Sequence, residues 1–389
     1  MKPQNLSRRA SAIAAALSVL LAACGGGGGG YGGTPTPPPT PPETLSALLT
    51  ADQESAAVAS GAFGQATFTL DRANYKLSAT VTVDGVTPTA AHIHAGEAGS
   101  DGAVVFPMTV SADGATLAST TLSAAQLASL DAGELYVNIH SADAPSGEIR
   151  GQVGREVFSV KLSGAQEVVP VDTTATGNGR LVLNPVTRAL SGEIELQGIT
   201  ATAAHIHTGA AGNNGGVLIT LEDHGGHGHF TVPANTVLTE AQAASLRAGE
   251  LYANVHSADF SGGELRGQIG QQVIFAEASG AQEVPANAST ASARGFVVYN
   301  PGNRGLSGSF TLNGVAATAA HLHNADVGVN GPVVIGLAET ATGSGVWVVP
   351  ANTVLTAAQA AALLSGQLYF NAHSAAVPSG EVRGQINVQ

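Results

Sequence analysis

The chain carries many short runs in which apolar and polar residues alternate, separated by turn residues. Alternation with a period of two is typical of strands that bury one face, and glycine, proline and asparagine between the runs indicate turns. About eight short strands at this spacing predict an antiparallel sandwich or barrel. In the middle third of the sequence the runs are 157–162, 179–183, 189–196, 203–207, 217–221, 229–232, 251–257 and 264–269.

One short helix is expected to interrupt these strands. Thr239 is followed three residues later by Gln242, which forms a capping box, and Gly249 is a stop signal. We therefore predict a helix between Thr239 and Gly249 with a structural role. The same pattern recurs twice, as Ser123, Gln126 and Gly133 and as Thr356, Gln359 and Gly366.

The whole pattern occurs three times. Ala-His-Ile-His at 91–94 returns at 204–207 and, as Ala-His-Leu-His, at 320–323, with offsets of 113 and 116 residues. A repeat of this length has the size of a domain and is too long for a solenoid unit. The sequence therefore predicts an all-β protein of three tandem Greek-key sandwich or barrel domains, each with one short helix, over residues 44–154, 155–270 and 271–389.

The chain begins with an export signal. Lys2, Arg8 and Arg9 precede a short apolar stretch that ends in Leu-Ala-Ala-Cys. This ending resembles a bacterial lipobox, in which the cysteine is lipidated and becomes the first residue of the mature chain. Cys24 is the only cysteine of the sequence, which excludes an intrachain disulfide. We expect a lipoprotein signal peptide over residues 1–23.

The next segment, residues 24–43, is rich in glycine and then proline and predicts a tether that lifts the folded part away from a lipid surface. Gly25 resembles the residue found after the cysteine of lipoproteins released to the outer membrane. We therefore expect an exported outer-membrane lipoprotein, held to the bilayer through Cys24, that faces the periplasm or the cell surface.

The net charge of the mature chain limits the kinds of partner that it can bind. Removal of Lys2, Arg8 and Arg9 with the signal reduces 15 basic residues to 12, against 28 acidic residues, so the mature net charge is −16. This balance excludes nucleic acid and disfavours anionic lipid headgroups as partners. Cations and neutral ligands remain open.

Nine of the twelve histidines fall at repeated positions. In each repeat a His-x-His is followed 46 to 50 residues later by a third histidine. Residues two apart on a strand share a face, so the first two imidazoles of each set can reach a single ion. Three imidazoles suit copper or zinc, and the lack of thiolates and of obvious carboxylate partners disfavours calcium or an iron–sulfur cluster. The candidate sets are His92, His94 and His140; His205, His207 and His256; and His321, His323 and His373.

The same residues allow a structural alternative. Tyr252, Asn254 and His256 share one face of a predicted strand, and Glu264 and Arg266 share a face of the last one. Such side chains can satisfy imidazoles without a metal. The protein would then be a non-enzymatic surface protein whose sheet faces bind another protein or a glycan. The residues expected to support the histidines in either case are Glu148, Arg150, Glu264, Arg266, Glu381 and Arg383.

A separate cluster, His224, His227 and His229, occurs in the second repeat alone. Glycines loosen this loop, so it is poorly preorganised for a metal, and its role is left open.

The repeated phrases resemble the CHRD domain family. The motifs are Ala-His-Ile-His followed by spaced glycines, then Leu-Tyr-x-Asn-x-His-Ser, then Gly-Glu-Ile-Arg-Gly-Gln, in three copies over about residues 45–389. The resemblance implies an immunoglobulin-like barrel that is distantly similar to copper–zinc superoxide dismutase. Membership alone implies no activity.

The similarity to a dismutase is partial. A dismutase has a His-x-His, a later copper-binding histidine and an active-site arginine in its final strand, in the order found here, with Arg150, Arg266 and Arg383 as the arginines. The bridging histidine, the zinc-loop ligands and the disulfide cysteines are absent from every repeat. The comparison implies a copper-only site in a binding module rather than an enzyme, with dismutase-like activity less favoured. Asn324 lies before the motif's glycine position, so an altered loop is expected in the third copy.

Overall fold

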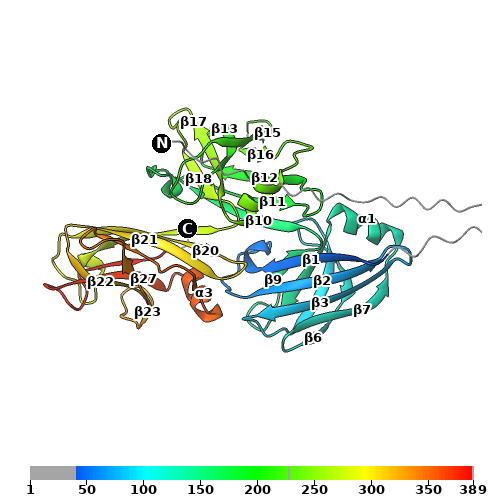
Figure 1. Cartoon of the computed structure of the whole chain (residues 1–389), viewed down its shortest axis with the longest axis horizontal. Helices are drawn as coiled ribbons and strands as arrows, with labels where there is room; N and C mark the ends of the chain where they lie inside the picture. Colours follow the sequence, from blue (N-terminus) through cyan, green and yellow to red (C-terminus); the bar gives the residue numbers. More distant parts are fainter. Residues whose placement is uncertain (1–40, 227, 388–389) are drawn as a thin grey trace, which may run out of the picture. The chain divides into compact units, whose positions relative to one another are not determined.

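The computed structural model describes residues 41–387 except residue 227. The signal peptide predicted over residues 1–23, Cys24 and most of the tether predicted over residues 24–43 lie outside the described residues. Within residues 41–387, three antiparallel sheets follow one another along the chain (Figure 1). No helix of this described part is both long and apolar enough to cross a bilayer.

The first sheet has nine strands in the order β5-β4-β8-β9-β1-β2-β3-β7-β6. A short helix, α1 (Ala124–Ala132), precedes β8, and a 3₁₀ turn, η1 (Ala51–Gln53), follows β1. The strands are β1 (Glu43–Thr50), β2 (Phe63–Asp71), β3 (Lys76–Asp84), β4 (Ala90–Ala95), β5 (Val104–Pro107), β6 (Thr109–Ser111), β7 (Gly114–Thr121), β8 (Leu135–His140) and β9 (Ile149–Gln152).

The second sheet repeats this order as β14-β13-β17-β18-β10-β11-β12-β16-β15. Its helix is α2 (Glu240–Arg247), and its 3₁₀ turn is η2 (Gly164–Gln166). The strands are β10 (Glu156–Ser163), β11 (Thr176–Leu183), β12 (Leu190–Gln197), β13 (Ala201–Thr208), β14 (Val217–Thr220), β15 (Glu222–Asp223), β16 (His229–Thr231), β17 (Leu251–Ser257) and β18 (Leu265–Gln268).

The third sheet has the order β23-β22-β27-β28-β19-β20-β21-β25-β24, and an extra short strand, β26, pairs with β21. Its helix is α3 (Ala357–Leu364), and its 3₁₀ turn is η3 (Gly280–Gln282). The strands are β19 (Gln272–Ser279), β20 (Ser292–Asn300), β21 (Gly305–Asn313), β22 (Ala317–Asn324), β23 (Val333–Gly336), β24 (Ala338–Glu339), β25 (Val346–Val348), β26 (Thr353–Val354), β27 (Leu368–Ser374) and β28 (Val382–Gln385).

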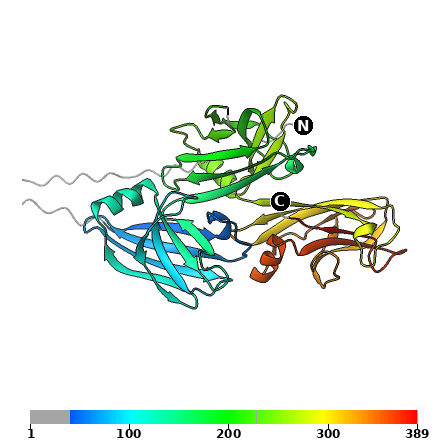
Figure 2. The same ribbon diagram turned by 180° about the vertical axis from the view of Figure 1, so that it is seen from behind.

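Each sheet curls until its two edges nearly meet. In the first domain the edge strands β5 and β6 are separated by Met108 alone, whose N–H donates to the carbonyl of Ala91 on β4 at 2.9 Å. The equivalent bonds in the other domains run from Leu221 to Ala204 at 3.0 Å and from Leu337 to Ala320 at 2.9 Å. The curvature of the sheets is visible from behind in Figure 2. The prediction of three tandem all-β domains is confirmed.

The alternation seen in the sequence separates the two faces of each barrel wall. Ile93 on β4 and Val137 and Ile139 on β8 are fully buried in the apolar core. Because side chains alternate along a strand, His92 and His94 lie on the outer face. The core therefore fixes the register that brings the histidines together.

The predicted helices are present with their caps. In α2 the hydroxyl of Thr239 accepts from the Gln242 N–H, and the side-chain oxygen of Gln242 accepts from the Thr239 N–H, at 3.2 and 2.8 Å. Gly249, just beyond the helix, has φ +70°. Ser123 and Thr356 cap α1 and α3 in the same way, so all three capping boxes are confirmed.

Candidate metal centre

The outer face of β4 and β8 carries the three predicted histidines of the first domain. In the antiparallel register, His92 lies opposite Asn138 and His94 opposite Tyr136, with His140 two residues further along β8 than Asn138. Side chains opposite one another in such a pair are close neighbours on one face. The two strands therefore bring His92, His94 and His140 into one group.

The same group forms in every domain. In the first domain the ring centroids of His92 lie 5.0 Å from His140 and 5.6 Å from His94, and those of His94 and His140 are 6.3 Å apart. The distances are 5.0, 5.6 and 6.4 Å in the second domain and 5.0, 5.6 and 6.2 Å in the third. In each set, one nitrogen of each histidine lies within 4.8 Å of the others, so the triads can hold a metal ion. The altered loop expected from Asn324 is not observed around the triad, because His323 Nδ1 donates to the carbonyl of Gly331 at 2.9 Å, as His94 and His207 do to the equivalent glycines.

Backbone carbonyls orient two imidazoles of each triad. His94 Nδ1 donates to the carbonyl of Gly102 at 2.9 Å, and His140 Nδ1 donates to that of Pro145 at 3.0 Å. A carbonyl only accepts, so these Nδ1 atoms carry the proton and leave the lone pair on Nε2. His92 Nδ1 lies 3.1 Å from His140 Nε2. In the first domain His94 Nε2 is therefore uncommitted, whereas His92 Nδ1 and His140 Nε2 contact each other.

The third domain shows these uncommitted nitrogens most clearly. His321 Nδ1, His323 Nε2 and His373 Nε2 are all buried, and none has a hydrogen-bond partner among the described residues. Leaving buried polar atoms unpaired is costly, and most such atoms in native proteins have a partner. A single metal ion would satisfy all three nitrogens at once.

The spacing suits a metal–imidazole site. Two nitrogens 3.1 Å apart, as in His92 and His140, subtend an angle of about 100° at an ion that is about 2.0–2.1 Å from each. This angle fits tetrahedral or tetragonal coordination, so the pair needs little rearrangement to share one ion.

Burial favours the neutral form of several of these imidazoles. It lowers the pKa of His92, His205 and His321, and the charge of neighbouring imidazoles acts in the same direction. Burial is also the main cause of the lowered pKa of His140, His256 and His323, where a hydrogen bond to a carbonyl acts in the opposite direction. Because neutral imidazole is the ligating form, the shifts favour metal binding.

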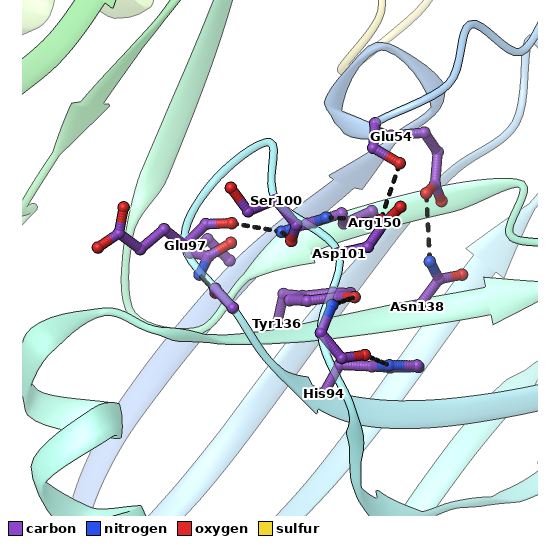
Figure 3. Close-up of polar contacts among 12 residues, drawn as sticks. Glu54, His94, Glu97, Ser100, Asp101, Tyr136, Asn138 and Arg150 are labelled. Atoms are coloured by element: carbon purple, nitrogen blue, oxygen red, sulfur yellow. Dashed lines mark hydrogen bonds and ion pairs between the residues drawn. The ribbon is translucent and has the colours of Figure 1, made fainter.

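The tyrosine that recurs in each repeat packs against one histidine of the triad, as Figure 3 shows for the first domain. The rings of Tyr136 and His94 stack with centroids 4.9 Å apart and 10° between their planes. On the other side of Tyr136, the guanidinium carbon of Arg150 lies 3.4 Å from the ring centroid. The tyrosine ring thus separates the arginine from the histidine.

Arg150 holds the loop that orients His94. Its Nη2 donates to the carbonyls of Glu97 and Ser100 at 2.6 and 2.9 Å, and its side chain is 1 % exposed. The same loop contains Gly102, whose carbonyl accepts the hydrogen bond from His94 Nδ1. Arg266 and Arg383 bond to loop carbonyls in the same way and stack on Tyr252 and Tyr369.

The glutamates expected to support the histidines contact hydroxyl groups instead. Within the described part of the chain their carboxylates make no hydrogen bond to the triads. Each accepts from a serine or threonine on the segment before the second strand of its domain: Glu148 from Ser60 at 2.6 Å, Glu264 from Thr173 at 2.8 Å and Glu381 from Ser289 at 2.8 Å.

A second set of buried glutamates was not predicted. The Asn138 amide donates to Glu54 at 3.2 Å, and burial raises the pKa of Glu54 to about 7 although Arg150 and Asn138 act to lower it (Figure 3). Burial also raises the pKa of the equivalent glutamates, which follow η2 and η3 and accept from the matching asparagines: Glu167 from Asn254 and Glu283 from Asn371. The Gln-Glu pair that recurs in all three repeats was the signal that could have found them.

A comparison with protein families settles the assignment of these repeats. The CHRD domain model matches residues 45–153, 158–269 and 274–386, which make up most of the chain. The chain belongs to the CHRD domain family. Each CHRD domain carries one histidine triad and one stacked Tyr–Arg pair. No curated protein matches the chain.

Proposed function

We propose that this CHRD protein binds copper at the cell envelope, with one ion in the histidine triad of each domain. The observation that carries the proposal is the set of three buried, unpaired imidazole nitrogens in the third domain, His321 Nδ1, His323 Nε2 and His373 Nε2. The other domains repeat the same arrangement of rings. Holding copper for storage or buffering needs no further residue.

The ligand set favours copper over zinc. All three ligands are neutral imidazoles, which suit both metals, and for a given nitrogen site the affinity for Cu²⁺ exceeds that for Zn²⁺. The second ring nitrogens of His94 and His140 donate to carbonyls, a contact that fixes ring orientation and makes the ligands more basic. Zinc remains the less favoured ion.

The structural alternative finds less support. In the described residues the imidazoles bond to one another and to backbone carbonyls, and the carboxylates of Glu148, Glu264 and Glu381 contact hydroxyls elsewhere. A network built to satisfy the imidazoles would not leave three converging nitrogens unpaired in the third domain.

The position of the arginines favours binding over dismutation. Arg150 lies behind Tyr136, is 1 % exposed and already bonds to two loop carbonyls. A guanidinium in this position cannot contact a small anion at the triad. The residue that would carry dismutase-like chemistry instead supports the loop beside His94.

The proposal includes a lipid anchor at Cys24 and an outer-membrane location facing the periplasm or the cell surface. It is supported by the signal-like residues 1–23 and by the Gly/Pro-rich segment after Cys24. Replacing Cys24 with alanine should move the protein from the membrane fraction to the soluble fraction. An unchanged membrane fraction would contradict the anchor and leave the copper proposal intact.

Electron paramagnetic resonance of the Cu²⁺-loaded mature chain tests the site itself. The proposal predicts one uniform copper signal with coupling to imidazole nitrogens, and three copper ions per chain. A spectrum with oxygen ligands alone, as for loosely bound copper, would contradict it.

A further inference from the structure

A second group of metal-ligating side chains lies on β12 and β16 of the second domain, apart from its triad. Glu193 and Glu195 are exposed on one face of β12, because Ile194 between them points into the core. His229 on β16 lies directly opposite Glu195, and its Nε2 is 2.9 Å from a carboxylate oxygen of Glu193. One ligand atom of each residue lies within 4.8 Å of the others.

The turn between β15 and β16 brings another imidazole to this group. Gly225, Gly226 and Gly228 adopt positive φ values of 93°, 70° and 79°, which allow a tight turn. The rings of His224 and His229 are consequently 5.5 Å apart. His227 of the same loop lies outside the described residues.

The local charge favours a cation. Strands β12, β15 and β16 carry four carboxylates, including Glu222 and Asp223, and no lysine or arginine. Arg180 on β11 lies opposite Glu193 in the register, yet the described residues contain no ion pair between them. A divalent ion would offset the repulsion between Glu193 and Glu195.

This group is not required by the shared fold. In the third domain the register positions of Glu195 and His229 are held by Thr311 and Val346, which face each other across the same pair of strands. Ser309 takes the position of Glu193. The same strands therefore form without any of these ligands.

We propose that Glu193, Glu195 and His229 form a surface zinc site, found in the second domain and not in the third, with His224 as the neighbouring imidazole. One imidazole and two carboxylates are ligands that zinc takes in proteins, and the mixed oxygen and nitrogen set differs from the all-imidazole triads. The site is independent of the copper proposed for the triads.

The test compares zinc binding to the wild-type mature chain and to the double variant Glu195→Thr, His229→Val. These substitutions introduce the residues that the third domain carries at the same positions, so the fold should be retained, which the melting temperature checks. Equilibrium dialysis with zinc alone should show one equivalent fewer for the variant. The wild type and the variant should differ by one zinc equivalent whether or not the triads also bind zinc. The test of the surface site therefore stands even if the copper proposal fails.

The result that overturns the site is the same number of zinc ions bound by the two proteins. As a matched gain of function, the triple variant Ser309→Glu, Thr311→Glu, Val346→His should bind one zinc ion more than the wild type. Loss of folding cannot produce such a gain.

Discussion

His94 shows how a single side chain is prepared to bind a metal. Its Nδ1 is committed to the carbonyl of Gly102, its ring face rests on Tyr136, and its Nε2 is buried without a partner among the described residues. The ring is therefore held in one tautomer and one orientation before an ion arrives. Preorganisation of this kind lowers the entropic cost of ligation.

Arg150→Lys tests the support behind this ligand. Lysine cannot reproduce the planar stack on Tyr136 or the paired bonds to the carbonyls of Glu97 and Ser100. We predict that copper affinity at the first site falls about 10- to 100-fold, the usual effect of losing such support. Competition with a copper chelator measures it. The control is Arg155→Lys, since Arg155 bonds to carbonyls of Gly154 and Asp131 away from the triad; equal losses in both variants would contradict the assigned role.

Glu54 makes the stability of the first domain depend on pH. Its pKa is raised from 4.5 to about 7 by burial, so the folded state binds more protons than the unfolded state between these values. The stabilisation by the neutral carboxyl is complete below about pH 4.5 and is lost as the pH rises through about 7.

Glu54→Gln should remove this dependence, because the amide cannot ionise. We predict that the variant is more stable than the wild type by about 3 kcal/mol at pH 8 and by less than about 1 kcal/mol at pH 5. Urea unfolding at the two pH values measures the difference. A variant that is less stable at pH 8 would show that Glu54 is held as a carboxylate.

Several residue positions could be predicted from the sequence and others could not. The nine triad histidines follow from repetition and strand parity alone. The carbonyls of Gly102 and Pro145 that orient them leave no signal in the sequence, because every residue has a carbonyl. The contacts of the Arg150 side chain could not be predicted either. The alternation of side chains along a strand gives the face on which Arg150 lies, but not the loop that covers that face.

At the scale of elements, the loop after the His-x-His strand decides the geometry of each site. In the second domain Gly215 donates its N–H to the Tyr252 hydroxyl and its carbonyl accepts from His207 Nδ1, at 3.2 and 3.0 Å. A Cβ at Gly215 would lie 1.6 Å from the carbonyl oxygen of Thr208. The glycine is therefore required by the close approach of the loop to β13.

Gly215→Ala should displace the loop and release His207. We predict a destabilisation of about 2–3 kcal/mol and the loss of one copper equivalent. Gly216→Ala is the control in the same loop, because a Cβ there meets no atom within 4 Å. Calorimetry and copper analysis of both variants check the prediction, and equal behaviour of the two alanines would contradict it.

The strands and helices were largely predictable, whereas the closure of the barrel was not. The capping boxes and the alternating runs identified the three helices and the strands around each triad. The short edge strands β6 and β15 pair with β7 and β16, but the bonds that close the barrel, such as that from Met108 to Ala91, join residues only after the sheet has curled. The alternation of apolar and polar residues within a short segment carries no information on such long-range pairing.

At the scale of the whole molecule, each domain contains its own core and its own triad. The three apolar core clusters draw their residues from one domain each. We predict that residues 155–270 alone unfold in one cooperative transition and bind one copper ion at the triad, measured by circular dichroism and metal analysis. A fragment without a cooperative transition would show that the domains depend on one another.

The copper content of the mature chain tests the central claim most directly. Protein made without a histidine tag and loaded with copper should contain close to three equivalents by elemental analysis. His92→Ala, His205→Ala and His321→Ala should each remove about one, because a two-histidine site must recruit solvent and binds far more weakly. A wild-type chain that stays metal-free under copper loading, with variants that are merely less stable, would contradict the account.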